Sequence, residues 1–165
     1  MSRAFVKEPD GEPERVEVPE RRHSPHPNYV TPTGLLQLRE RVRRLAALCD
    51  ELIASGDKAD PKRLQYAARD LDYYGERLRR ALPVEPDNLP LDEVRFGSTV
   101  TVGLPDGERR VFAIVGEVEA DVALGKISWV SPLARALLHG RVGDTVLWQR
   151  PAGGIELEIL ELSSP

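Results

Sequence analysis

Residues 32–82 read PTGLLQLRERVRRLAALCDELIASGDKADPKRLQYAARDLDYYGERLRRAL, and this stretch decides the fold. Apolar side chains repeat through it at alternating spacings of three and four residues, the a/d pattern of a helix that buries one seam. Because two seams joined by a short break cover each other only when the chain folds back, the pattern predicts an antiparallel two-helix coiled coil. The seam positions are Leu35, Leu38, Val42, Leu45, Cys49 and Leu52, then Leu64, Ala67, Leu71, Tyr74, Leu78 and Ala81.

The ends of both helices carry recognisable signals. Thr31-Pro32 and Asp60-Pro61 each combine a capping side chain with a proline suited to the first helical turn. We therefore expect a hairpin over 31–82, with a first helix to about residue 55, a tip at 56–61 and a second helix to about residue 82. Each arm of 22 to 24 residues would be roughly 33–36 Å long at 1.5 Å per residue.

The segments on either side of the hairpin are rich in proline. Residues 1–30 contain five prolines, many charges and few large apolar groups, so we expect a disordered or extended tail. Pro83, Pro86 and Pro90 predict a stiff linker over 83–93.

From residue 94 to 162 the apolar period changes to two, which predicts strands. We expect strands near 96–102, 110–115, 126–130, 145–149 and 155–160. Ser131-Pro132 should cap one short helix over 133–139. The prediction is an α+β fold in which a small antiparallel sheet carries one helix and follows the coiled coil in sequence.

Composition excludes several classes of protein. No apolar run approaches the ~20 residues that span a bilayer, the N-terminus lacks the apolar region of a secretion signal, and the single Cys49 cannot form an internal disulfide, so we expect a cytoplasmic protein. Residues 31–82 carry 11 Lys or Arg against 8 Asp or Glu, and residues 91–165 carry 7 against 11. A mildly basic rod on a mildly acidic base predicts a protein partner rather than free-standing DNA binding.

Self-contained catalysis finds little support in the sequence. It has no nucleotide-binding glycine loop and no zinc-ligand spacing, and Ser131 and His139 stand at expected helix ends. Asp57 and Asp60 lie three residues apart at the tip. Either they form half of a Mg²⁺ site that another protein completes, or Asp60 is simply the cap of the second helix and Asp57 a polar tip residue.

The C-terminal half resembles the GreA/GreB family of bacterial transcription elongation factors over about residues 94–162. The resemblance is carried by Val94–Val100, Ile114–Glu117 with Glu119–Asp121, Gly125–Ser128, Ser131–Leu138, Val142–Asp144 and Pro151–Glu156. Weaker similarity in the hairpin comes from Gly56-Asp57 and from the segment Gly75–Leu78.

This resemblance implies an FKBP-like C-terminal domain that docks at the rim of the RNA polymerase secondary channel through Ser131, Pro132 and Leu133. The coiled coil would enter the channel as a monomer, and Asp57 and Asp60 would share a Mg²⁺ ion of the active centre and assist the enzyme's own cleavage of backtracked RNA. The factor would have no cofactor of its own. The basic residues Lys58, Lys62, Arg63 and Arg69 would run beside the nascent RNA, with at most weak nucleic-acid contact.

Three departures from the family pattern bear on that role. Asp60 stands where the family has a glutamate, Pro61 follows it directly, and each arm is about one heptad shorter, which would place the tip ~10 Å short. A Gre-like regulator that occupies the channel without cleavage therefore remains an alternative. A third class, an FKBP-like prolyl isomerase or chaperone, is poorly supported because few aromatic residues are available for a proline pocket.

Overall fold

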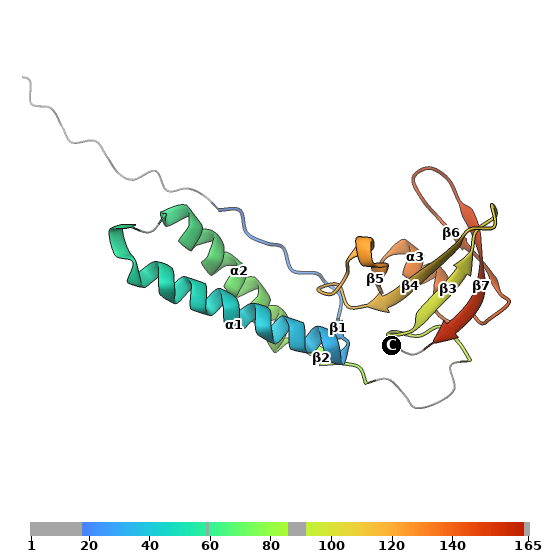
Figure 1. Ribbon diagram of the computed structural model, residues 1–165, viewed down its shortest axis with the longest axis horizontal. Helices are drawn as coiled ribbons and strands as arrows, with labels where there is room; N and C mark the ends of the chain where they lie inside the picture. Colours follow the sequence, from blue (N-terminus) through green and yellow to red (C-terminus); the bar gives the residue numbers. More distant parts are fainter. Residues whose placement is uncertain (1–17, 59, 86–91, 164–165) are drawn as a thin grey trace, which may run out of the picture.

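The computed structural model describes residues 18–58, 60–85 and 92–163, and shows a helical rod joined at one end to a small sheet domain (Figure 1). The rod consists of α1 (Pro32–Ala54) and α2 (Pro61–Arg79), with the 3-10 turn η1 (Gly56–Lys58) at its far end. The sheet domain contains β3 (Thr99–Gly103), β4 (Arg109–Val115), η2 (Val122–Leu124), β5 (Lys126–Ser128), α3 (Pro132–Leu137), β6 (Thr145–Trp148) and β7 (Ile155–Ser163). The predicted α+β class is confirmed.

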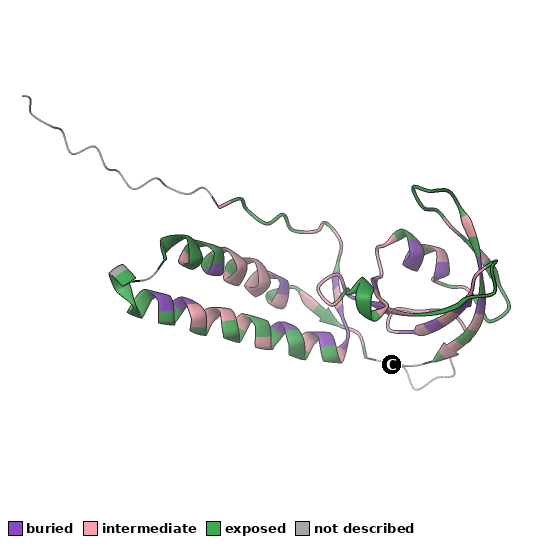
Figure 2. Ribbon diagram, turned by 45° about the horizontal axis from the view of Figure 1, so that its top comes forward, coloured by how far each residue is buried: buried purple, intermediate pink, exposed green. Residues whose placement is uncertain are grey.

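A single apolar seam holds the rod together. All twelve predicted seam positions are buried or half-buried, and the best-buried part lies near the tip, where Cys49, Leu52 and Ala67 pack with Leu48, Leu64 and Leu71. Figure 2 shows the outer faces of both helices as exposed. Because the buried positions of each helix face the other helix, the prediction of a coiled-coil hairpin is confirmed by the burial pattern.

The predicted caps form at the start of both helices. The Oγ1 atom of Thr31 accepts a hydrogen bond from the Gly34 amide at 3.0 Å, and Oδ1 of Asp60 accepts one from the Lys62 amide at 2.9 Å. The second helix ends at Arg79, earlier than expected, because the next residues form strand β2 (Ala81–Pro83).

Strand β1 (Asn28–Val30) differs from the expected tail over 1–30. It pairs in parallel with β2, and Asn28 and Val30 are 4% and 0% exposed. The tail prediction is therefore wrong for residues 28–30, because composition could not reveal a partner strand some 50 residues away. Residues 1–17 and 86–91, which include most of the predicted tail and of the linker, lie outside the described residues.

The five-stranded sheet has the order β5-β4-β3-β7-β6. All its pairs are antiparallel except β4 with β5, so the expectation of a fully antiparallel sheet is wrong at that edge. The chain leaves β4, forms the loop 116–125 and returns to run beside β4 in the same direction. Helix α3 lies over one face and contributes Leu133, Ala134 and Leu137 to a core shared with Val100, Val102, Ile114, Leu157 and Ile159.

We predict that Leu52→Ala destabilises the rod by about 2–4 kcal/mol, because Leu52 is 5% exposed and its loss leaves a cavity in the seam. Urea unfolding followed by the helical circular dichroism signal measures this change. Leu36→Ala, on the same helix but at a position that is 63% exposed, should change stability by less than about 0.5 kcal/mol. Equal effects of the two variants would contradict the single-seam description.

Candidate functional site

The two predicted acidic residues lie at the tip of the rod, in the turn between α1 and α2. Asp57 belongs to η1, and its side chain lies outside what the structure describes. Asp60 is exposed, has an extended backbone (φ −71°, ψ 115°), and uses Oδ1 to accept from the Lys62 amide. Asp60 therefore caps α2, as one of the two sequence interpretations expected, and this role uses one of its two carboxylate oxygens.

The chemistry of the tip fits a partial site for a hard cation. Carboxylate oxygens are the ligands that Mg²⁺ prefers, but the ion needs near-octahedral coordination, so two aspartates are too few for tight binding. Among the described residues, no group of three or more His, Cys, Asp or Glu side chains is arranged to hold a metal ion. Asp57 and Asp60 would thus contribute ligands only to an ion that a partner also binds.

The four predicted basic residues differ in their surroundings. Lys58, Lys62 and Arg63 are exposed near the tip. Arg69 is half-buried: its Nε and Nη2 atoms donate to Oδ1 of Asp70 at 3.0 and 2.7 Å, and its Nη1 atom donates to the carbonyl of Pro19 at 3.3 Å. Arg69 therefore holds the N-terminal segment against α2.

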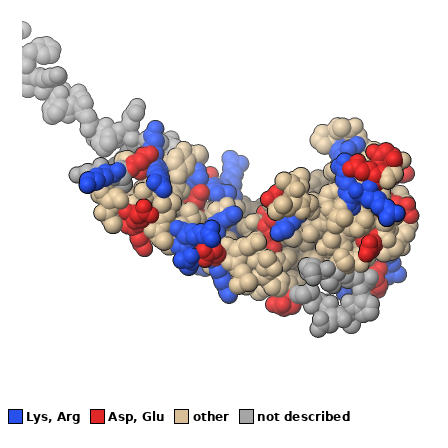
Figure 3. All heavy atoms as spheres, viewed as in Figure 1, with Lys and Arg blue, Asp and Glu red and all other residues tan. Residues whose placement is uncertain are grey.

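Positive charge along the rod is interrupted by acidic side chains. Figure 3 shows several groups of Lys and Arg on the face in view, with Asp and Glu between them. Glu40 binds Nε of both Arg43 and Arg44 at 2.7 Å, and these guanidinium hydrogen bonds lower the pKa of Glu40 to about 2. The rod therefore lacks the concentrated basic face of a DNA-binding helix on this side.

The start of α3 presents only part of the predicted docking set. Oγ of Ser131 accepts from the Ala134 amide at 3.2 Å and caps the helix. Pro132 is exposed, whereas Leu133 is 5% exposed and packs in the domain core. A partner that touched this corner would meet the ring of Pro132 and the edge of Ser131, and Leu133 would act by supporting them from inside.

Cys49 and His139 show no arrangement for catalysis. Burial, followed by the nearby carboxylates of Asp50 and Asp72, raises the pKa of the Cys49 thiol, which keeps it protonated and unreactive. His139 adopts a left-handed backbone (φ 69°) directly after α3, and its side chain is 81% exposed. Cys49 is thus a buried residue of the seam, and His139 is an exposed residue after the end of α3.

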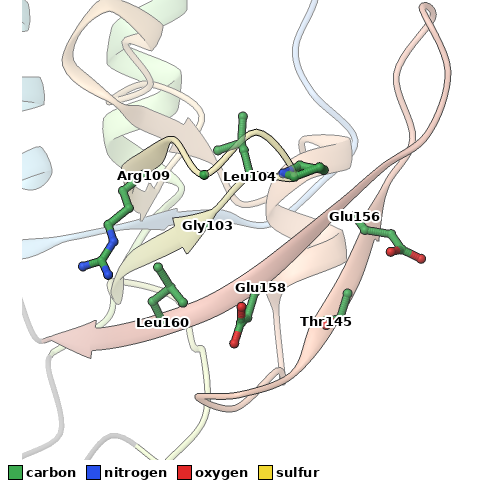
Figure 4. Close-up of a pocket in the computed structure, with 9 residues that line it drawn as sticks. Gly103, Leu104, Arg109, Thr145, Glu156, Glu158 and Leu160 are labelled. Carbon is green, nitrogen blue, oxygen red and sulfur yellow. The ribbon is translucent and has the colours of Figure 1, made fainter.

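An open groove of about 400 Å³ lies on the outer side of the sheet, between the β3–β4 turn and the β6–β7 pair. Its charged side chains are Arg109, Glu156 and Glu158. Figure 4 shows that the two carboxylates point in different directions and that Arg109 lies at the other end of the groove. Because these groups do not converge on a common point, the groove is a poor candidate for an active site.

No helix among the described residues combines the length and apolar character that crossing a membrane requires.

The chain is similar in sequence to several known proteins. Residues 89–164 match the family model described as transcription elongation factor, GreA/GreB, C-term. The chain is 33% identical over 151 residues to transcription elongation factor GreB of Neisseria meningitidis, with 82% of the chain and 93% of that protein covered. It is 45% identical over 87 residues to transcription elongation factor GreA of Bacillus licheniformis, covering 52% of the chain and 55% of that protein.

A solved structure gives a weaker match. The GreA factor homolog Gfh1 of Thermus thermophilus is 28% identical, with 84% of the chain and all of that protein covered, at a TM-score of 0.39.

We predict that Asp60→Ala lowers the stability of the hairpin by about 0.5–2 kcal/mol, because the cap of α2 is lost. Asp60→Asn keeps a side-chain oxygen for the Lys62 amide and should stay within about 0.5 kcal/mol of the parent protein. Urea unfolding followed by helical circular dichroism compares the two. If Asn were as damaging as Ala, the carboxylate would have a structural role beyond capping.

We also predict that Leu133→Ala destabilises the sheet domain by about 2–5 kcal/mol, because it opens a cavity beneath α3. Pro132→Ala, one residue earlier but exposed, should cost less than about 0.5 kcal/mol. Tryptophan fluorescence follows this transition, since both tryptophans, Trp129 and Trp148, pack against the domain core. An unchanged midpoint for Leu133→Ala would show that its side chain is not part of that core.

Proposed function

The chain belongs to the GreA/GreB family of transcription elongation factors, and on this premise we propose that it binds RNA polymerase through its sheet domain and inserts the rod into the secondary channel. The observation that carries the proposal is the extent of the similarity to GreB. It covers 82% of the chain, more than residues 89–164 can provide, so the relationship includes part of the rod as well as the domain.

The rod suits a role as a rigid probe. Its 23-residue first helix is about 34 Å long at 1.5 Å per residue, and the hairpin is narrow because it contains only two helices. The turn between α1 and α2 lies at the end remote from the sheet domain (Figure 1), and Asp60, the exposed N-cap of α2, closes this turn. A probe of this form can carry a carboxylate into a channel that a globular protein could not enter.

At the far end of the channel, Asp57 and Asp60 would hold a Mg²⁺ ion together with groups of the polymerase. Such an ion supplies Lewis-acid activation of water, so the protein would stimulate the RNA cleavage of the polymerase without a catalytic centre of its own. Asp60 can serve while it caps α2, because the cap needs only Oδ1. Lys58, Lys62 and Arg63 would lie beside the phosphates of the displaced RNA.

A second function has one observation in its favour. Because Asp60 is committed to the cap and is followed by Pro61, its carboxylate has little freedom to turn toward an ion. A rod that entered the channel without delivering a ligand would occupy it and compete with factors that promote cleavage. The two functions share the same binding mode and differ only in what the tip does.

We predict that the protein added to backtracked elongation complexes with Mg²⁺ accelerates transcript cleavage, and that Asp57→Asn with Asp60→Asn reduces this acceleration at least ~10²-fold, since misplacing a catalytic group has effects of that size. Asparagine at position 60 keeps the cap of α2, so we expect the rod to remain folded. Gel analysis of the shortened RNA measures the rate.

Lys126→Gln, a charge change in the sheet domain away from the tip, serves as the matched control and should cleave like the parent. Binding to polymerase without any cleavage would support the channel-occupying function. Normal cleavage by the double asparagine variant would show that the tip carboxylates are structural only.

A further inference from the structure

We infer that residues 116–119, here named the joint loop, set the direction in which the rod leaves the sheet domain, with Glu119 as the principal positioning residue. The loop directly follows β4 and reaches the base of the rod, where it contacts both helices. The structural part of this inference stands by itself, and its consequence for transcription rests on the proposed function.

The carboxylate of Glu119 completes the N-terminus of α1. Its Oε2 atom accepts hydrogen bonds from the Thr31 amide at 2.9 Å and from the Gly116 amide at 3.2 Å, and its Oε1 atom accepts one from the Thr31 hydroxyl. The first turn of α1 contains no acidic residue. Since a negative charge near a helix N-terminus is favourable, the sheet domain supplies a group that the helix itself lacks.

Two glycines allow this close approach. A Cβ atom added to Gly34 would lie 1.9 Å from Cδ of Glu119, and one added to Gly116 would lie 2.2 Å from the carbonyl oxygen of Tyr29. At Gly116 the clash is with backbone, so only glycine permits the present separation there, whereas at Gly34 the added atom would force the Glu119 carboxylate to move away. The joint loop therefore lies close against the base of the rod at both glycines.

The same loop also contacts the end of α2. Arg77, in the last turn of α2, is 3% exposed, and its Nη2 atom binds Oε2 of Glu117 at 3.3 Å. Val118, between the two glutamates, lines a small cavity with Gly34, Leu38 and Arg41 of α1. One short loop thus holds the beginning of one helix and the end of the other, which opposes both tilt and rotation of the rod.

Strand β1 adds a second attachment between the same two parts. Tyr29 packs against Trp129 at 5.2 Å and Phe96 at 5.9 Å between ring centroids, both in the sheet domain. On its other side, Asn28 donates to the carbonyl of Arg77 at 2.6 Å. The rod is consequently attached through the joint loop and through β1.

The length of the rod converts small angular changes at the joint into large displacements at the tip. For a rod of about 34 Å, a tilt of ~10° moves the tip by ~6 Å. Displacements of ~1 Å already reduce catalysis strongly. The joint loop therefore acts on the tip at a distance, through the direction of the helices.

The first test measures the distance between spin labels at the tip and on the domain. Labels are attached to cysteines introduced by Lys58→Cys and Val142→Cys, both at exposed positions, in a Cys49→Ala background. We expect Glu119→Ala to broaden or shift the distance distribution. Glu40→Ala, which removes a glutamate paired with two arginines on the exposed face of α1, should leave the distribution unchanged. An unchanged distribution for Glu119→Ala overturns the inference.

A second variant disturbs the joint from the helix side. Gly34→Ala should favour α1, because alanine is a better helix former than glycine, yet its methyl group would displace the Glu119 carboxylate. We expect retained helical circular dichroism together with an altered label distance. An unchanged distance between the labels in Gly34→Ala would show that the Glu119 contact can rearrange without moving the rod. This result would also overturn the inference.

A functional experiment distinguishes a positioning role of the joint loop from a docking role. With full-length Glu119→Ala, we expect the affinity for polymerase to change less than ~3-fold, while the effect on transcript cleavage at saturation falls at least ~10-fold. Equal losses of affinity and effect would make the loop a docking surface and overturn the positioning role. Absence of polymerase binding by the parent protein would defeat the proposed function, while the label distances would still decide whether the joint exists.

Discussion

The carboxylate of Glu119, placed at the N-terminus of α1, is the interaction on which the arrangement of the molecule depends. The rod and the sheet domain have separate apolar cores, and each is stabilised by its own core. A fixed orientation of the rod relative to the sheet domain needs a specific contact, because two parts joined only by a linker would move independently. Glu119 supplies such a contact by accepting from Thr31 and Gly116 at the point where the rod begins, and β1 adds a second one through Tyr29.

The rod itself shows how little is needed to maintain a long, narrow element. One seam of leucines and small residues holds two helices, and Thr31 and Asp60 each accept a hydrogen bond from one amide at the start of their helix. The best-buried cluster of the seam ends at Leu52 and Leu64, next to the tip. The start of α2 at the tip also depends on the Asp60 cap, and the proposed function needs the same residue as a ligand. Because one side chain has both roles, cleavage and channel occupation are both consistent with the fold.

Local sequence patterns predicted which residues begin helices but not which of them face a partner. Ser131-Pro132 correctly indicated the start of α3, yet the docking set included Leu133, which is buried. The spacing of Leu133, Ala134 and Leu137 already carried that signal, since these positions share one helical face. Arg69 was expected near RNA because its charge is visible in the sequence, whereas its partners Asp70 and Pro19 follow only from the folded chain.

The sequence by itself determined the elements whose cause is local: the period of the seam, the proline-marked caps, and the alternation of the strands in the sheet domain. Tertiary structure decided the pairing of β1 with β2, the parallel pairing of β5 with β4, and the contact of the joint loop with both helices. Each of these joins residues far apart in the chain, such as Thr31 and Glu119, 88 positions apart. No local pattern records such a pair, because the free energy that favours it exists only once both surfaces have formed.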